Sequence, residues 1–198
     1  DNADMAALRK RLKLTDGRQV VLYAPTFRPK TTGRGVAPLE VPWLEEFVAR
    51  YGDRMVLLVR PHYLATFGLP PALRHAVRNV ADVHDITPLY QVSDALVTDY
   101  SSVMFDYALL HRPMIFHVPD YDDYVAGRGA YFDLTQWAPG PLTRTDDELL
   151  AALADLPALG ERYAEKHRAF AERFATYDRG DAAQTVVERY FAPGVRRG

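Results

Sequence analysis

Short apolar runs alternate along this chain with longer segments in which apolar residues recur at every third or fourth position. Four runs, 19–24, 55–60, 95–97 and 113–118, are rich in valine, leucine and isoleucine, and the first is flanked by Gly17 and Pro25. This composition predicts strands that are buried on both faces. A further short strand is expected within 80–86.

Helices are expected between these strands. Trp43, Leu44, Phe47 and Val48 share one face at helical spacing, and Thr145 with Glu148 forms a capping box at the start of another helix. The expected helices cover 5–14, 42–51, 69–77, a short segment capped by Thr87, 103–110, a segment after Thr145, 161–174 and 181–191. The alternation predicts an α/β fold, a Rossmann-like parallel sheet flanked by helices.

Length and composition fit one domain with its own core. The 198 residues are 48% hydrophobic and 25% charged, and 24 basic against 26 acidic side chains leave a net charge of −2. No general attraction to nucleic acid is therefore expected. Cysteine is absent, which excludes disulfides and thiolate metal sites, and no apolar run reaches transmembrane length.

One stretch concentrates hydroxyl groups at a predicted strand–helix junction. Thr98, Asp99, Tyr100, Ser101 and Ser102 follow the apolar run 95–97 directly. A helix start leaves backbone N–H groups unpaired and carries partial positive charge, so it binds phosphate well. The alternative is that Asp99 or Ser101 only caps the helix, for which one oxygen would suffice.

Two other predicted strands end in polar loops. Thr26 and Arg28 follow the first strand, and Arg60 and His62 follow the second. Because parallel strands carry their loops to one edge of the sheet, the three loops are expected to meet at one crevice suited to a diphosphate. Taken singly, each arginine could be an ordinary surface or ion-pairing residue, and His62 could be structural.

Asp106 and Arg128 are weaker candidates for the same site. Asp106 interrupts an apolar helix, so it either pairs with a neighbouring group or orients Arg60 or His62. The glycines beside Arg128 would let backbone amides approach an anion. His-carboxylate metal motifs, GxGxxG, the P-loop and GxSxG are all absent, so no metal site and no cofactor is predicted.

The ordered motifs resemble the CDP-glycerol glycerophosphotransferases, the teichoic-acid primases and polymerases of bacterial cell walls. The resemblance runs from about Val20 to Phe191. It rests on the segments 21–28, 60–62 and 93–107, with further matches at Arg112-Pro113, Asp120 with Tyr124, Arg128-Gly129 with Tyr131, and 139–141.

This resemblance implies the C-terminal, donor-binding half of a GT-B fold, as one domain over residues 1–198 of a larger two-domain protein. The family's N-terminal domain, with its acceptor-side histidine, has no counterpart here, so the chain alone is expected to be inactive. The implied partners are a CDP-glycerol or related CDP-polyol donor and a lipid-linked or polymeric acceptor. The complete protein would be cytoplasmic and peripheral on the inner face of the bacterial membrane.

Site residues follow from the same resemblance. His62 is the implied catalytic histidine near the donor pyrophosphate, and Ser101 and Ser102 lie at the phosphate-binding helix start. Further implied site residues are Arg28, Arg60, Thr98 and Asp99, with Thr26, Asp106 and Arg128 in supporting positions. A nucleotide-sugar glycosyltransferase of the same fold and a non-catalytic nucleotide-binding module are the alternatives.

Overall fold

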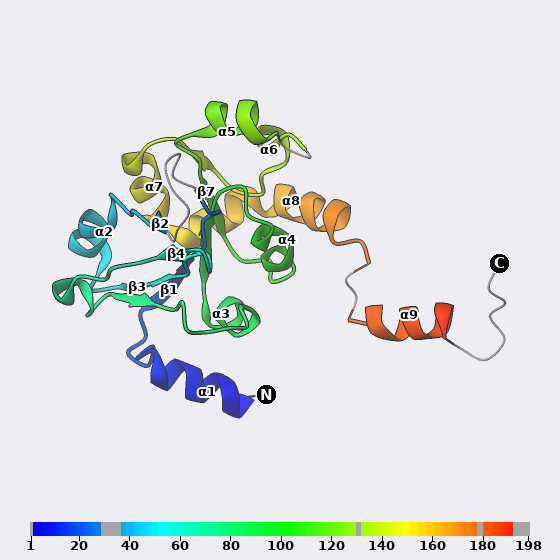
Figure 1. Cartoon of the computed structure of the whole chain (residues 1–198), viewed down its shortest axis with the longest axis horizontal. Helices are drawn as coiled ribbons and strands as arrows, with labels where there is room; N and C mark the ends of the chain where they lie inside the picture. Colours follow the sequence, from blue (N-terminus) through cyan, green and yellow to red (C-terminus); the bar gives the residue numbers. More distant parts are fainter. Residues whose placement is uncertain (1, 29–36, 130–131, 178–179, 192–198) are drawn as a thin grey trace.

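A parallel sheet of six strands forms the centre of the molecule (Figure 1). The computed structural model describes residues 2–28, 37–129, 132–177 and 180–191. The strands are β1 (Gln19–Tyr23), β3 (Met55–Val59), β5 (Val77–Asn79), β6 (Ala95–Thr98), β7 (Met114–His117) and β8 (Leu142–Thr143).

The strand order is β5-β3-β1-β6-β7-β8, and every neighbouring pair is parallel. After β1 the chain moves outward to β3 and β5, and then returns to place β6 on the other side of β1. Loops leaving β1 and β6 therefore separate in opposite directions, which opens a crevice at their carboxyl ends. The predicted Rossmann-like α/β fold is confirmed.

Helices cover both faces of the sheet (Figure 1). Alternate side chains of β1 divide between two cores, with Val20 and Leu22 in one and Val21 and Tyr23 in the other. The first core contains α1 (Asn2–Arg11), α3 (Thr87–Val92) and α4 (Val103–Ala108), the second contains α2 (Leu44–Tyr51) and α7 (Asp146–Leu153), and α8 (Leu156–Phe174) contributes to both.

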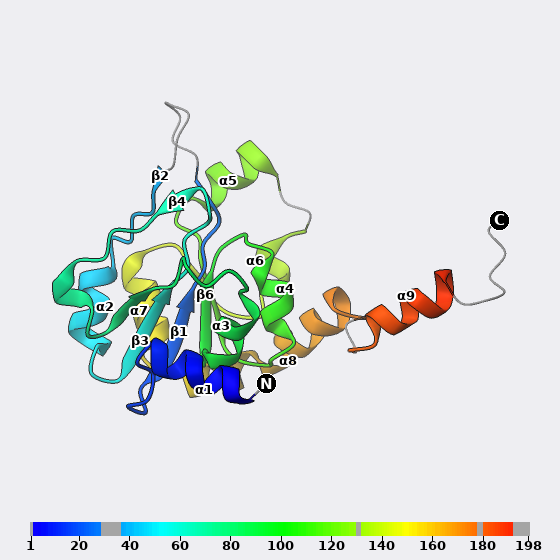
Figure 2. The ribbon, with the colours of Figure 1, turned by 60° about the horizontal axis from the view of Figure 1, so that its bottom comes forward.

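Smaller elements extend the loops around the sheet. Strands β2 (Ala37–Pro38) and β4 (Ala65–Thr66) pair in parallel and connect the loops that follow β1 and β3. The helices α5 (Tyr121–Arg128) and α6 (Leu134–Trp137) belong to the segment of the chain that connects β7 to β8. Helix α9 (Ala182–Tyr190) projects away from the body in both ribbon views (Figure 2). Among the described residues, no helix is both long and apolar enough to cross a lipid bilayer.

The edge of the sheet next to β3 differs from the prediction. The strand is β5, upstream of the expected 80–86, and the helix expected over 69–77 is only a 3₁₀ turn, η1 (Pro71–Leu73). Arg60 explains the difference, because its guanidinium donates to the carbonyl oxygens of Val80, Ala81, Val83 and His84. These carbonyl groups are satisfied without a strand partner.

Helix starts were predicted with mixed success. The capping box of Thr145 and Glu148 is confirmed. Thr87 is wrong as a cap: it is the first helical residue, and its N–H donates to the Asp85 carboxylate. Helix α8 begins at Leu156, upstream of the predicted 161, because Asp155 caps its first turn.

Strand β8 was not predicted, and it depends on a glycine. A Cβ built on Gly140 would lie 1.8 Å from the Met114 carbonyl oxygen, so only glycine lets the chain approach β7 this closely. Gly127, within α5, has no atom within 4 Å of the same position.

Gly140→Ala should therefore destabilise the fold by about 1–3 kcal/mol or more, because the backbone of β7 cannot move aside cheaply. The matched control Gly127→Ala should be neutral or stabilising by up to about 1 kcal/mol. Urea unfolding of both variants measures the difference. Equal midpoints would show that β8 tolerates a wider spacing.

Candidate functional site

The carboxylate of Asp99 organises the crevice between β1 and β6. It is 2% exposed and accepts hydrogen bonds from the Thr26 N–H at 2.9 Å and the Thr26 hydroxyl at 2.7 Å. It also accepts from the N–H groups of Tyr100 at 2.6 Å and Ser101 at 3.2 Å. One buried carboxylate thus joins the loop after β1 to the turn after β6.

Arg28 lies between two carboxylates at this edge. Its Nη2 is 2.9 Å from Asp99 Oδ2, and its Nε donates to Asp120 Oδ2 at 2.7 Å. Burial lowers the pKa of the guanidinium, but its hydrogen bonds to Asp120 and the charge of Asp99 outweigh burial and hold that pKa above its ordinary value. The guanidinium also stands 5.2 Å from the ring centroids of Tyr100 and Tyr124, which stack on each other.

A pocket of about 470 Å³ opens beside this network, at the carboxyl ends of the strands. The three predicted site residues Thr26, Arg28 and Asp99 line it together with His62. Its remaining walls are apolar or aromatic side chains and three further carboxylates: Tyr23, Pro25, Phe27, Ala37, Pro38, Leu39, Glu40, Pro42, Trp43, Ala65, His117, Pro119, Asp120 and Asp146. The structure therefore brings all three predicted loops to one pocket, the first through Thr26 and Arg28, the second through His62 and the third through Asp99.

The imidazole of His62 is held in one orientation. Its Nδ1 accepts the N–H of Leu64 at 3.2 Å, so the neutral ring carries its proton on Nε2. The ring stacks on Phe27 with centroids 5.3 Å apart and lies 4.2 Å from the ring of Tyr63. A fixed ring with its N–H at Nε2 can donate a hydrogen bond, and it donates a proton only in the imidazolium form.

The turn after β6 presents two serines. Ser101 is partly exposed, Ser102 is exposed and is the N-cap residue of α4, and no hydrogen bond from either hydroxyl to a described residue is found. Thr98 differs, because it is fully buried and its hydroxyl donates to the Ala24 carbonyl oxygen at 2.8 Å. Thr98 joins β6 to β1, whereas the serine hydroxyls remain available to a ligand.

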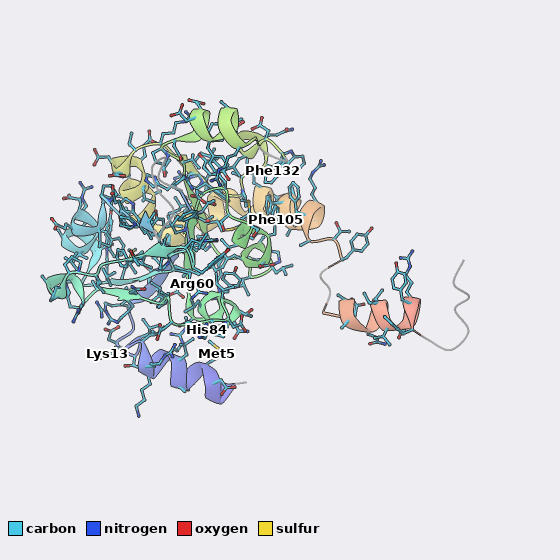
Figure 3. All side chains as sticks on the ribbon, viewed as in Figure 1. Met5, Lys13, Arg60, His84, Phe105 and Phe132 are labelled. Atoms are coloured by element: carbon cyan, nitrogen blue, oxygen red, sulfur yellow. The ribbon has the colours of Figure 1, made fainter. Side chains whose placement is uncertain are left out.

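Six predicted site residues do not line the pocket: Thr98, Ser101 and Ser102, and also Arg60, Asp106 and Arg128. The Arg60 guanidinium holds the 80–84 loop, and its side chain lies beside His84 (Figure 3). Asp106 is exposed rather than buried. The pKa of the nearby Tyr90 hydroxyl is raised, first by the burial of Tyr90 itself and then by the charge of Asp106. Arg128 is exposed at the end of α5, 5.9 Å from the Tyr124 ring. Tyr131 lies outside the described residues.

Sequence reasoning missed the floor of the pocket. His117, at the end of β7, has Nδ1 3.1 Å from the Thr143 hydroxyl and Nε2 3.3 Å from an Asp146 oxygen. Burial lowers the pKa of His117 despite the opposing charge of Asp146. Only their positions in the sequence could have indicated these residues: Tyr23 and His117 end apolar strands, and Asp146 begins a capped helix. Within the described ranges, no cluster of three or more His, Asp or Glu side chains forms a metal site.

A doubly wound parallel sheet with a polar crevice at its switch point defines the Rossmann-like class of α/β proteins. Comparison with known families then gives the particular group. The model of the CDP-Glycerol:Poly(glycerophosphate) glycerophosphotransferase family matches residues 1–192, and the chain belongs to this family.

Curated relatives agree with this assignment. The chain is 35% identical over 191 residues to a teichoic acid poly(glycerol phosphate) polymerase of Staphylococcus epidermidis, covering 94% of this chain and 26% of that protein. It is 34% identical over 194 residues to a teichoic acid glycerol-phosphate transferase of Staphylococcus aureus, covering 96% of this chain and 50% of that protein. The chain therefore spans half or less of these two relatives.

A solved structure shows the same fold. The wall teichoic acid polymerase TagF superimposes with a TM-score of 0.83 at 34% identity, over 94% of this chain and 46% of that chain. The expected relation to a GT-B polymerase is confirmed at the level of the fold.

Asp99→Asn should destabilise the protein by at least about 2 kcal/mol, because the amide places N–H donors against other donors and leaves Arg28 without a buried counter-charge. Asp120→Asn is the matched control. Its carboxylate is 36% exposed and contacts the same arginine, so it should cost under about 1 kcal/mol. Thermal unfolding compares them, and equal losses would show that Asp99 does not organise the crevice.

Proposed function

We propose that this chain is the donor-binding part of a phosphotransferase that moves glycerol phosphate from CDP-glycerol to a hydroxyl of a growing teichoic-acid-type polymer. The observation that supports the proposal is that, in a chain of this family, an oriented histidine follows β3 and two available serine hydroxyls follow β6, the two strands on either side of β1. A lipid-linked acceptor and a position on the inner membrane face belong to the same proposal.

The donor diphosphate would lie at the start of α4. Ser101 and Ser102 supply hydroxyl donors there, and the backbone N–H of Ser101 is already held by Asp99. Thr26 and Arg28 fix the loop after β1 through their contacts with Asp99, so this loop does not have to rearrange when the donor binds. We assign the diphosphate contacts to the two serines and His62, and a scaffolding role to Thr26, Arg28, Thr98 and Asp99.

The chemistry needs little beyond position and charge. The acceptor oxygen forms a bond to the β-phosphorus, the bridging P–O bond breaks, and CMP leaves with the bridging oxygen and its electron pair. Negative charge grows on that oxygen, and fixed donors aimed at it stabilise the transition state. Protonated His62 Nε2 would donate to the leaving phosphate.

The acceptor side belongs to another part of the protein in this proposal. We assign no base for the acceptor hydroxyl to the described residues, and the chain spans half or less of its first curated relatives. We therefore expect the 198 residues alone to bind donor without catalysing transfer.

The double variant Ser101→Ala/Ser102→Ala tests the diphosphate position. It should weaken CDP-glycerol binding by about tenfold or more, because hydrogen bonds to charged oxygens are lost. Calorimetry on the chain gives the dissociation constant, and circular dichroism confirms that the fold is intact. Unchanged affinity in a folded variant would move the diphosphate away from α4.

His62→Ala tests the histidine in a complete protein that contains this chain. The change should lower kcat by a factor of about 10²–10⁴ and stability by less than about 1 kcal/mol, because His62 is at the pocket rim rather than in the core. His75→Ala is the matched control, since His75 is exposed and outside the pocket. If both variants turn over equally, another acid must serve the leaving group.

A further inference from the structure

A second cavity lies at the edge of the sheet opposite the crevice. Its volume is about 260 Å³, and it is next to the start of β7, where the chain arrives from α4. Residues 111–114, Pro139 and one side of α8 between Leu159 and Arg168 line it. Because the crevice lies at the carboxyl ends of the strands, the proposed function assigns no role to this cavity.

The imidazole of His167, on α8, lines the cavity without a hydrogen-bond partner. The residue is 6% exposed, and neither Nδ1 nor Nε2 has a described partner in hydrogen-bond geometry. Burial, and next the charge of His111, lower the pKa of His167, and the smaller opposing effect of the Arg112 backbone does not reverse this. A buried ring with unpaired nitrogens costs free energy unless a ligand binds it.

His111 brings a second imidazole to the same place. Its ring centroid is 5.4 Å from that of His167, and the two ring planes are inclined by 50°. His111 has a φ of +52°, in the left-handed region that residues other than glycine adopt rarely and at a cost in free energy. It is exposed, and no hydrogen bond of its ring to a described residue is found. The backbone therefore holds an exposed imidazole against a buried one.

The spacing of the two rings fits two ligands of one metal ion. With metal–nitrogen bonds of about 2.0–2.1 Å at a tetrahedral angle, two imidazoles place their ring centroids about 5 Å apart. An anion that accepts from two N–H groups lies about 3 Å from each nitrogen, so it would hold the rings further apart. Neutral imidazole is the form that binds metal, and it suits zinc, copper and nickel.

The two arginines that line the cavity do not oppose a cation at the rings. Arg168 is paired with Glu165 at 3.0 Å. Arg112 donates to three backbone carbonyl oxygens at the end of α3. Neither guanidinium contributes to the shift in the pKa of His167, so both charges act at a distance from this ring.

We propose that His111 and His167 bind a divalent transition-metal ion such as Zn²⁺, and that the ion holds α8 to the connection between α4 and β7. No Asp or Glu of the described residues lines the cavity, so water completes the coordination. Two protein ligands are fewer than the four of a closed structural zinc site, and the affinity should be correspondingly lower.

His111→Asn tests the exposed ligand. Asparagine tolerates the left-handed backbone, so this variant should fold while losing one imidazole. Calorimetric titration of the complete protein with ZnCl₂, after treatment with EDTA and its removal, should show binding at least about tenfold weaker than in the wild type. His75→Asn is the matched control. His75 is exposed and outside the cavity, so this variant should keep the wild-type affinity.

His167→Leu separates a metal ligand from a structural histidine. In metal-free protein this apolar replacement should leave the midpoint of thermal unfolding unchanged or raise it, because it removes two unpaired ring nitrogens. Zn²⁺ should raise the midpoint of the wild type and of His75→Asn, but not that of His167→Leu. The inference is overturned if Zn²⁺ does not bind the wild type, or if it binds the wild type and both cavity variants equally. It is also overturned if inorganic phosphate, and not Zn²⁺, stabilises the wild type through these two histidines.

Discussion

The buried carboxylate of Asp99 is the constraint on which the crevice depends. It accepts hydrogen bonds from both sides of the switch point and faces Arg28, so the loops after β1 and β6 are held together before any ligand arrives. The Thr98 hydroxyl adds a second link, to Ala24. Ligand binding then costs less conformational entropy, because these loops are already ordered. The crevice is therefore preorganised for electrostatic stabilisation of a bound ligand.

Arg28 extends this order outward. Its contacts with Asp120 and with the stacked rings of Tyr100 and Tyr124 attach α5 to the crevice, although α5 buries none of its own residues. The charge of Arg28 is paired with Asp99 and Asp120 inside the protein. The carboxyl edge of the sheet therefore has two different environments. Hydroxyl donors face outward at α4, while carboxylates and aromatic rings line the pocket.

The long apolar strands were predictable because their burial is set by local composition. Strands β1, β3, β6 and β7 lie within a residue of the predicted runs at most of their ends, since β-branched and apolar residues on both faces fit only the centre of a parallel sheet. The edge strands were not predictable. β5 and β8 are two or three residues long, and they depend on Arg60 binding a distant loop and on Gly140 approaching Met114.

By itself the sequence determined the fold class, the family resemblance and the loops that carry chemistry, because these follow from local pattern and from motifs. Only the tertiary structure decided the task of each side chain. Arg28 and Arg60 look alike in the sequence, yet one is at the pocket and the other holds a loop. The pocket floor of Tyr23, His117 and Asp146 is drawn from three separate elements, and no local pattern records that they meet. Partners of a buried polar group are set by the packing of distant segments.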